Sequence, residues 1–263
     1  MTKHYCCLEI CFAVLLVFEL VSGNVPHHHE DSVKFIVSYP IKIRGEYDLP
    51  LCNSTFSPCN ILELRFWRPM LIQRQCLCPA RTTCPFNWSN NDSDNSTVWI
   101  SNRSQMKFCA PVNLETCSDS PSVAAAELST FSEMVSPREY ARLDSDDTRK
   151  SLAVVHKDTV LFCICPRRRY WSPLGDPVKE TGPKNVVVVK QKFSCALLDY
   201  CYQGDFCGHI RADLFSTYHR CFCPPGHLCV FDTDRNTTHV DEFHFQGPAL
   251  SGQCLLDDSE DRK

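Results

Sequence analysis

The stretch Arg220-Cys221-Phe222-Cys223-Pro224-Pro225-Gly226-His227-Leu228-Cys229 decides the fold through its spacing, C-x-C-P-x4-C. Residues 75–84 repeat this spacing, and residues 162–171 repeat it with Trp171 in place of the last cysteine. Alternate residues of a β-strand share one face, so each C-x-C pair is expected to point two sulfurs to the same side of a strand. Three occurrences predict an internal repeat that is stapled by disulfides.

Residues 1–23 have the pattern of a secretory signal peptide. Lys3 and His4 give a weakly basic start, residues 10–21 are mostly apolar, and the segment ends in the small residues Ser22 and Gly23. The apolar run is short and is interrupted by Glu19, which argues against a membrane span. We therefore expect a secreted, extracellular protein without a membrane anchor.

The cysteine count predicts a disulfide framework. The chain has 19 cysteines, and three of them, Cys6, Cys7 and Cys11, leave with the signal peptide. The 16 that remain are an even number, which in a secreted chain predicts up to eight bonds. The same removal takes away one lysine and two glutamates and changes the net charge from −4 to −3. So small a charge does not indicate nucleic acid as a partner.

Six N-x-S/T sequons predict N-glycosylation at exposed sites. They lie at Asn53, Asn87, Asn91, Asn95, Asn102 and Asn236. Four of the six fall between Cys84 and Cys109, so we expect that segment to be exposed.

The cysteines divide the mature chain into three modules. We place a lead-in strand within residues 24–51, modules at 52–116, 117–196 and 197–256, and an acidic tail at 257–263. The first module contains Cys52, Cys59, Cys76, Cys78, Cys84 and Cys109, and the third contains Cys201, Cys207, Cys221, Cys223, Cys229 and Cys254. Their last two intervals, C-x5-C and C-x24-C, are identical. Residues 118–150 form an acidic, serine-rich insert, which we interpret as a linker with a helical stretch near 123–135.

The middle module has only four cysteines, Cys117, Cys163, Cys165 and Cys195. It lacks the second and fifth positions of the other modules. Because the loss of one bonded partner would leave a free thiol, cysteines are expected to disappear in bonded pairs. This predicts the bonds Cys59–Cys84 and Cys207–Cys229, with Trp171 filling the space of the missing bond. The other four positions leave two arrangements open, 1–3 with 4–6 or 1–4 with 3–6.

Apolar residues alternate over 33–43, which predicts a strand. The apolar-rich stretches 151–164 and 186–193, and their equivalents 64–77 and 98–108 in the first module, also predict strands. The predicted fold class is therefore all-β, small and disulfide-rich, with three tandem cysteine-stapled β-hairpin (finger) modules. Each hairpin would join the C-x-C strand to a return strand that ends at the sixth cysteine. A module of about 55 residues buries little surface, so the bonds, at about 2–4 kcal/mol each, would supply most of its stability. The middle module should be the weakest unless it packs on its neighbours.

The pattern Arg220-Cys221-Phe222-Cys223 with Gly226 and Cys229, preceded by Cys207 and followed by Cys254, resembles the C-terminal half of the colipase-like modules of colipase, Dickkopf proteins and prokineticins. That resemblance implies 1–3, 2–5 and 4–6 pairing, hence Cys201–Cys221 and Cys223–Cys254, with the same order in the first module. The triple array also resembles the Argos (giant-lens) proteins of insects and the scoloptoxin-type proteins of centipede venom. Both resemblances imply a non-enzymatic, secreted binding protein.

The sequence gives catalysis little support. It contains no G-x-S-x-G, H-E-x-x-H or phosphate-binding loop, and its mature cysteines are assigned to bonds. The third module holds five histidines whose spacing fits no metal-ligand set, and we expect them to be exposed in loops. They are His209, His219, His227, His239 and His244. We therefore expect no enzyme activity, no metal and no cofactor.

Three binding hypotheses remain. The first is a venom toxin that acts on an extracellular target such as an ion channel or receptor. The second is an antagonist of receptor signalling that sequesters a growth factor, and the third is a protease inhibitor. The candidate contact is Arg167-Arg168-Arg169-Tyr170-Trp171, in which cations adjoin aromatic rings; Arg168 would be the inhibitory residue. The similar stretch Phe66-Trp67-Arg68 is interpreted as core rather than contact.

Overall fold

The computed structural model describes residues 35–79, 82–91, 93–134, 152–183, 186–213, 216–232 and 237–257. The predicted signal peptide, part of the insert, Asn236 and most of the acidic tail lie outside the described residues. The described part is nearly all β, which confirms the expected all-β class. It contains no α-helix and one short 3-10 helix, η1 (Glu46–Asp48). No described helix therefore has the length and apolar character needed to cross a membrane.

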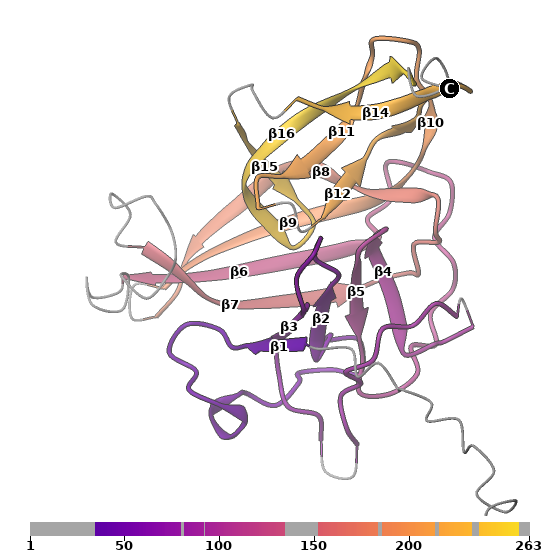
Figure 1. Ribbon diagram of the computed structural model, residues 1–263. Helices are drawn as coiled ribbons and strands as arrows, with labels where there is room; N and C mark the ends of the chain where they lie inside the picture. The colour runs from indigo at the N-terminus through magenta and orange to yellow at the C-terminus, as the bar shows by residue number, and fades with distance from the viewer. Residues whose placement is uncertain are drawn as a thin grey trace, which may run out of the picture. The chain divides into compact units, whose positions relative to one another are not determined.

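The first module forms a five-stranded sheet in the order β1-β3-β2-β5-β4. Its strands are β1 (Phe35–Ser38), β2 (Asn60–Glu63), β3 (Met70–Arg74), β4 (Thr97–Ser101) and β5 (Ser104–Lys107) (Figure 1). Strand β1 belongs to the lead-in segment and pairs in parallel with β3. The expected lead-in strand is therefore present, although it is shorter than the predicted range of 33–43.

The second module forms a four-stranded sheet in the order β7-β6-β9-β8. Its strands are β6 (Ala126–Met134), β7 (Leu152–Leu161), β8 (Arg169–Thr181) and β9 (Val187–Leu197). The prediction of a helical stretch and linker at this place is wrong, because β6 lies in the sheet between β7 and β9. Every second residue of β6 is buried from Ala126 to Ser132, which is the period of a strand with one buried face.

The third module forms a sheet in the order β12-β11-β16-β14, and β15 also pairs with β16. These strands are β11 (Phe206–Arg211), β12 (Thr217–His219), β14 (His227–Phe231), β15 (Thr238–Glu242) and β16 (Phe245–Leu256). The short strands β10 (Asp199–Tyr200) and β13 (Cys221–Phe222) pair in parallel with each other.

One strand plan is common to the three sheets. In each module the first strand (β2, β6 or β11) lies between the strand that leads to the C-x-C pair and the return strand that leads to the sixth cysteine. The prediction that the C-x-C strand and the return strand form a hairpin is therefore wrong. The central strand of the first module, β2, is hard to predict from the sequence because it has only four residues. All four are buried, so the strand shows no alternation.

A parallel backbone contact also recurs at the start of each module. The residue before the first cysteine pairs with the residue inside the C-x-C pair; the pairs are Leu51 with Leu77, Thr116 with Ile164, and Tyr200 with Phe222. The backbone N–H of the first cysteine donates to the carbonyl oxygen of the residue inside the C-x-C pair, at an N···O distance of 2.9 Å in all three modules. Identical contacts at equivalent positions show that the modules are structural repeats.

Eight disulfides connect the described cysteines in the order 1–3, 2–5 and 4–6, and the middle module lacks the 2–5 bond. The bonds are Cys52–Cys76, Cys59–Cys84, Cys78–Cys109, Cys117–Cys163, Cys165–Cys195, Cys201–Cys221, Cys207–Cys229 and Cys223–Cys254. The 2–5 bonds are those derived from the reduced repeat, and the other pairs are those that the colipase resemblance implied. This arrangement decides between the two alternatives that the repeat left open.

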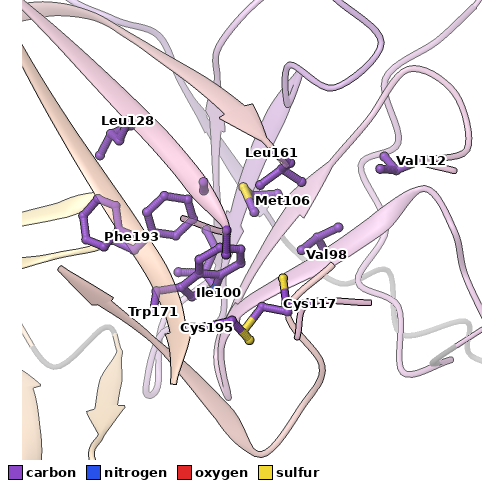
Figure 2. Packing of buried hydrophobic residues seen from close by; sticks show 14 of the residues in the cluster. Val98, Ile100, Met106, Val112, Cys117, Leu128, Leu161, Trp171, Phe193 and Cys195 are labelled. Carbon is purple, nitrogen blue, oxygen red and sulfur yellow. A yellow bond between two sulfur atoms is a disulfide. The ribbon is translucent and has the colours of Figure 1, made fainter. Parts of the chain in front are cut away.

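The largest cluster of buried side chains is centred on the middle module. It joins Trp171, Phe193 and Leu161 of that module to Met106 of the first (Figure 2). Phe243 of the third module belongs to the same cluster. Each outer module has a small cluster of its own cysteines, and the first also has a small apolar cluster of Leu62, Met70 and Ile72. The module with one bond fewer is therefore the one whose core is shared with both neighbours.

Candidate binding cleft

A cleft of about 560 Å³ is lined by residues of all three modules. The first module contributes Trp99 of β4. The second contributes residues 167–171, which are the contact residues predicted from the sequence. The third contributes Arg220 and Phe222, among others, from the segment of β12 and β13. Residues more than a hundred positions apart in the chain thus meet at one surface.

The middle module presents its arginines on a tight turn between the C-x-C pair and β8. Arg168 has a backbone φ of +69°, in the left-handed region that L-residues with a β-carbon avoid. The equivalent residue of the third module, three positions after the C-x-C pair, is Gly226 with a φ of +74°. Both modules therefore make the same turn. Only the third module has glycine at this position, the residue that adopts a positive φ without strain.

Two of the cations in the cleft are stacked on aromatic rings. The guanidinium carbon of Arg167 lies 3.7 Å from the centroid of the Trp99 ring. That of Arg220 lies 4.6 Å from the centroid of Tyr170. Stacking restricts the rotamers of each arginine while the edge of its guanidinium plane keeps its N–H donors. The cations are consequently oriented before any partner binds.

One acidic residue, Glu242, is among the residues that line the cleft. It is buried, pairs with Arg220 and has its Oε1 3.1 Å from Nδ1 of His209. Arg169 is engaged in a similar way, by Asp119 and by the carbonyl oxygen of Ser118. Arg168 is exposed and has no hydrogen bond or ion pair with the rest of the described chain. The lining therefore carries an excess of positive charge.

Trp171 forms part of the floor of the cleft and plays a structural role. Its side chain is only 3% exposed, stacks on Phe243 with ring centroids 4.5 Å apart, and donates from Nε1 to the carbonyl oxygen of Trp99 at 3.0 Å. Trp171 takes the position of the fifth cysteine, opposite Cys195 as Cys229 is opposite Cys254. It therefore fills the place of the missing bond and, through Trp99 and Phe243, also ties the second module to the first and the third.

A network of charged and polar side chains joins the modules beside this core. Arg211 of the third module donates to Glu63 of the first at 2.6 Å. Lys157 of the second donates to the carbonyl oxygen of His244 at 2.8 Å, and Thr159 Oγ1 lies 3.0 Å from Nε2 of the same histidine. Burial lowers the pKa of Lys157 to about 8 and that of His244 to about 3. The same cause raises the pKa of Glu63, although Arg211 opposes the change. No single module contains these pairs, so sequence analysis did not detect them.

The histidines of the third module are not the exposed loop residues that we expected. His239 is exposed, but the other four are partly buried, and burial also lowers the pKa of His219. None of the five belongs to a group of ligand atoms that lie close together in the described residues. In the described residues, the groups close enough to hold a metal consist of cysteines that are already bonded.

Two other predictions concern the exposure of surface residues. The five described sequon asparagines, all except Asn236, have exposed side chains. Asn102 is at the rim of the cleft, where its Oδ1 accepts a hydrogen bond from Thr217 at 2.8 Å. The interpretation of residues 66–68 as core is wrong for Trp67, which is 93% exposed.

Comparison with known proteins gives one structural likeness. No family model and no curated protein matches the chain. A solved structure titled "Crystal Structure of unliganded Argos" is similar, with a TM-score of 0.48 and 21% identity over 85% of this chain and 99% of that one. These values establish no family membership. The resemblances to venom proteins and to colipase-like modules are not confirmed by the comparisons.

Proposed function

We propose that the protein is a secreted, non-enzymatic antagonist that binds an extracellular growth factor and keeps it from its receptor. The observation that carries this proposal is the cleft, in which the second and third modules present arginines that are oriented by aromatic rings of the first and second. Arginine, tryptophan and tyrosine are the residues that dominate the binding energy of protein interfaces. A contact surface of this kind suits a protein ligand.

The rigidity of the scaffold supports the same proposal. Disulfides fix each module, and the shared core around Trp171 fixes the modules against one another. A surface that is ordered before binding loses less conformational entropy when the partner docks. Stable sequestration of a ligand depends on a slow release rate, and a preorganised surface favours it.

The alternatives gain less from the geometry. The toxin interpretation has no support in the cleft or in the comparisons. The protease-inhibitor interpretation needs Arg168 in the extended conformation in which a strand-like segment docks, whereas its φ of +69° belongs to a tight turn. The sequestering antagonist is therefore the function that we propose.

A titration of receptor signalling tests this function. Cells that carry a growth-factor receptor would be treated with a fixed amount of growth factor and increasing amounts of the purified mature protein, and receptor phosphorylation would be measured. We expect signalling to fall as the protein approaches the molar amount of the growth factor and to recover when more growth factor is added. Unchanged signalling across a panel of secreted growth factors from the source organism would contradict the proposal.

A further inference from the structure

We propose that the cleft recognises an acidic segment of its protein partner and that Arg168 is the residue that selects it. This inference rests on the proposed binding function of the cleft and names the chemistry of the ligand. Three observations lead to it: the charge of the lining, the conformation of Arg168 and the aromatic walls.

The charge of the lining favours an anionic ligand. Glu242 is the one acidic residue among the described residues of the lining, and it is already paired with Arg220 and His209. This described lining therefore has no unpaired carboxylate that would repel an anionic ligand. Arg167 and Arg168 are both exposed at the cleft. The mature chain as a whole is slightly acidic, so this cationic site is a local feature rather than the result of a generally basic surface. A guanidinium group binds a carboxylate with paired, charge-assisted hydrogen bonds.

The conformation of Arg168 points to the same role. A left-handed conformation is unfavourable for a residue with a β-carbon, and Gly226 shows that glycine serves at the equivalent turn. At Gly226 the space around an added β-carbon is open, so the turn itself does not require a side chain for packing, and Arg168 is exposed at the equivalent turn. Arg168 makes no hydrogen bond or ion pair within the described residues that would offset its strain. Strain that is maintained without an internal benefit is typical of functional sites.

The walls of the cleft favour a peptide over a polysaccharide. Trp99 and Tyr170 flank the arginines, and Phe222, which is 40% exposed, continues the apolar surface onto the third module. Aromatic rings beside cations suit a chain in which acidic and apolar side chains are adjacent. A sulfated polysaccharide would instead call for an extended basic stripe, and the net charge of −3 does not indicate one.

The test uses the full mature chain and a defined probe. The probe is a fluorescein-labelled peptide of alternating glutamate and tyrosine, and a lysine–tyrosine peptide of equal length is the control. Fluorescence anisotropy would be measured for the wild type, Arg168→Gly and Arg168→Lys, and for Arg44→Ala as the matched variant of an exposed arginine outside the cleft.

We expect the acidic peptide to bind in a salt-dependent way and the basic peptide not to bind. Arg168→Gly should weaken binding at least tenfold, Arg168→Lys should weaken it less, and Arg44→Ala should leave it unchanged. Arg168→Gly relieves the turn, so circular dichroism and disulfide mapping should show an intact fold. Equal affinity for both peptides, no binding of the acidic peptide, or full affinity of Arg168→Gly would overturn the inference. Heparin binding with the same dependence on Arg168, without preference for the acidic peptide, would also overturn it by assigning the cleft to a polysaccharide.

The two proposals fail in different ways. Antagonism of a growth factor that persists in Arg168→Gly would overturn the inference and leave the proposed function standing. Acidic-peptide binding that depends on Arg168, in a protein that inhibits no growth factor, would leave the inference standing and overturn the proposed function.

Discussion

The middle and third modules have the same strand order and are held together in different ways. The third has three disulfides and a small cluster made of its own cysteines. The middle one has two disulfides. Its second position is Ala125, whose backbone N–H donates to the carbonyl oxygen of Phe193 as that of Cys59 donates to Lys107 in the first module. Ala125 and Trp171, which is at the fifth position, lie in a core that both neighbours share. In the middle module, packing against both neighbours thus takes the place of one covalent bond. That replacement also fixes the walls of the cleft, because Trp171 contacts Trp99 on one side and Phe243 on the other.

The largest expected effect comes from removing this packing. Trp171→Ala should lower the free energy of unfolding by about 3–5 kcal/mol, as is typical of a large aromatic side chain removed from a core. Denaturant unfolding followed by far-UV circular dichroism would measure it. Trp67→Ala is the matched control, since Trp67 is 93% exposed and should have almost no effect. Equal effects of the two substitutions would show that Trp171 does not hold the modules together.

Removal of a bond from the third module should have a smaller and more local effect. The double variant Cys207→Ala, Cys229→Ala should cost about 2–4 kcal/mol, the usual contribution of one disulfide. Proteolysis would locate the change, and we expect new cleavage sites in the third module. Cleavage that appears first in the middle module would contradict the distinction between a self-contained and a dependent module.

The junction of the middle and third modules should weaken in acid. Burial lowers the pKa of His244 to about 3, so in the unfolded chain, where it is near 6.5, this histidine takes up a proton at higher pH than in the folded one. The contribution of His244 to the free energy of unfolding is therefore complete above pH 6.5 and is lost as the pH decreases toward 3. The total loss is about 1.4 kcal/mol for each unit by which its pKa differs between the folded and unfolded chain. Asparagine tolerates the left-handed φ of +66° at this position, so His244→Asn should lose less stability than the wild type between pH 6.5 and 4. Thermal unfolding across this range would measure the slopes, and the exposed His239→Asn should behave like the wild type.

The smallest expected effect compares the two turns directly. Arg168→Gly should stabilise the protein by up to about 1 kcal/mol, because glycine adopts the left-handed conformation without strain. Gly226→Ala should destabilise it by a similar amount, since its φ is +74° and nothing else lies within 4 Å of an added β-carbon. Chemical unfolding would measure both. Effects of the same sign would show that the turns are not equivalent.

The sequence predicted what depends on spacing along the chain. The cysteine intervals were enough to identify the repeat and the 2–5 bonds, and the position of Trp171 after Cys165 indicated that it would fill the vacant site. These features are local to one module. Each follows from comparing equivalent positions.

The sequence did not reveal what depends on contacts between modules. The sequence of β6 favours a helix, because it contains alanine, glutamate and leucine, and because the polar residues Thr130 and Ser132 on the buried face hide the alternation of a strand. Pairing with β7 and β9 outweighs that local preference. The cleft was found only in part, since the predicted residues 167–170 meet Trp99 and Arg220 only after the modules have packed.

Hydrogen exchange measured by mass spectrometry in increasing denaturant tests most directly whether the middle module depends on its neighbours. If the shared core around Trp171 replaces the missing bond, the amides of β9 should open in the same cooperative step as those of β5 and β16, with the same free energy and dependence on denaturant. Exchange of the β9 amides in a separate step, at lower free energy than both outer sheets, would contradict the account.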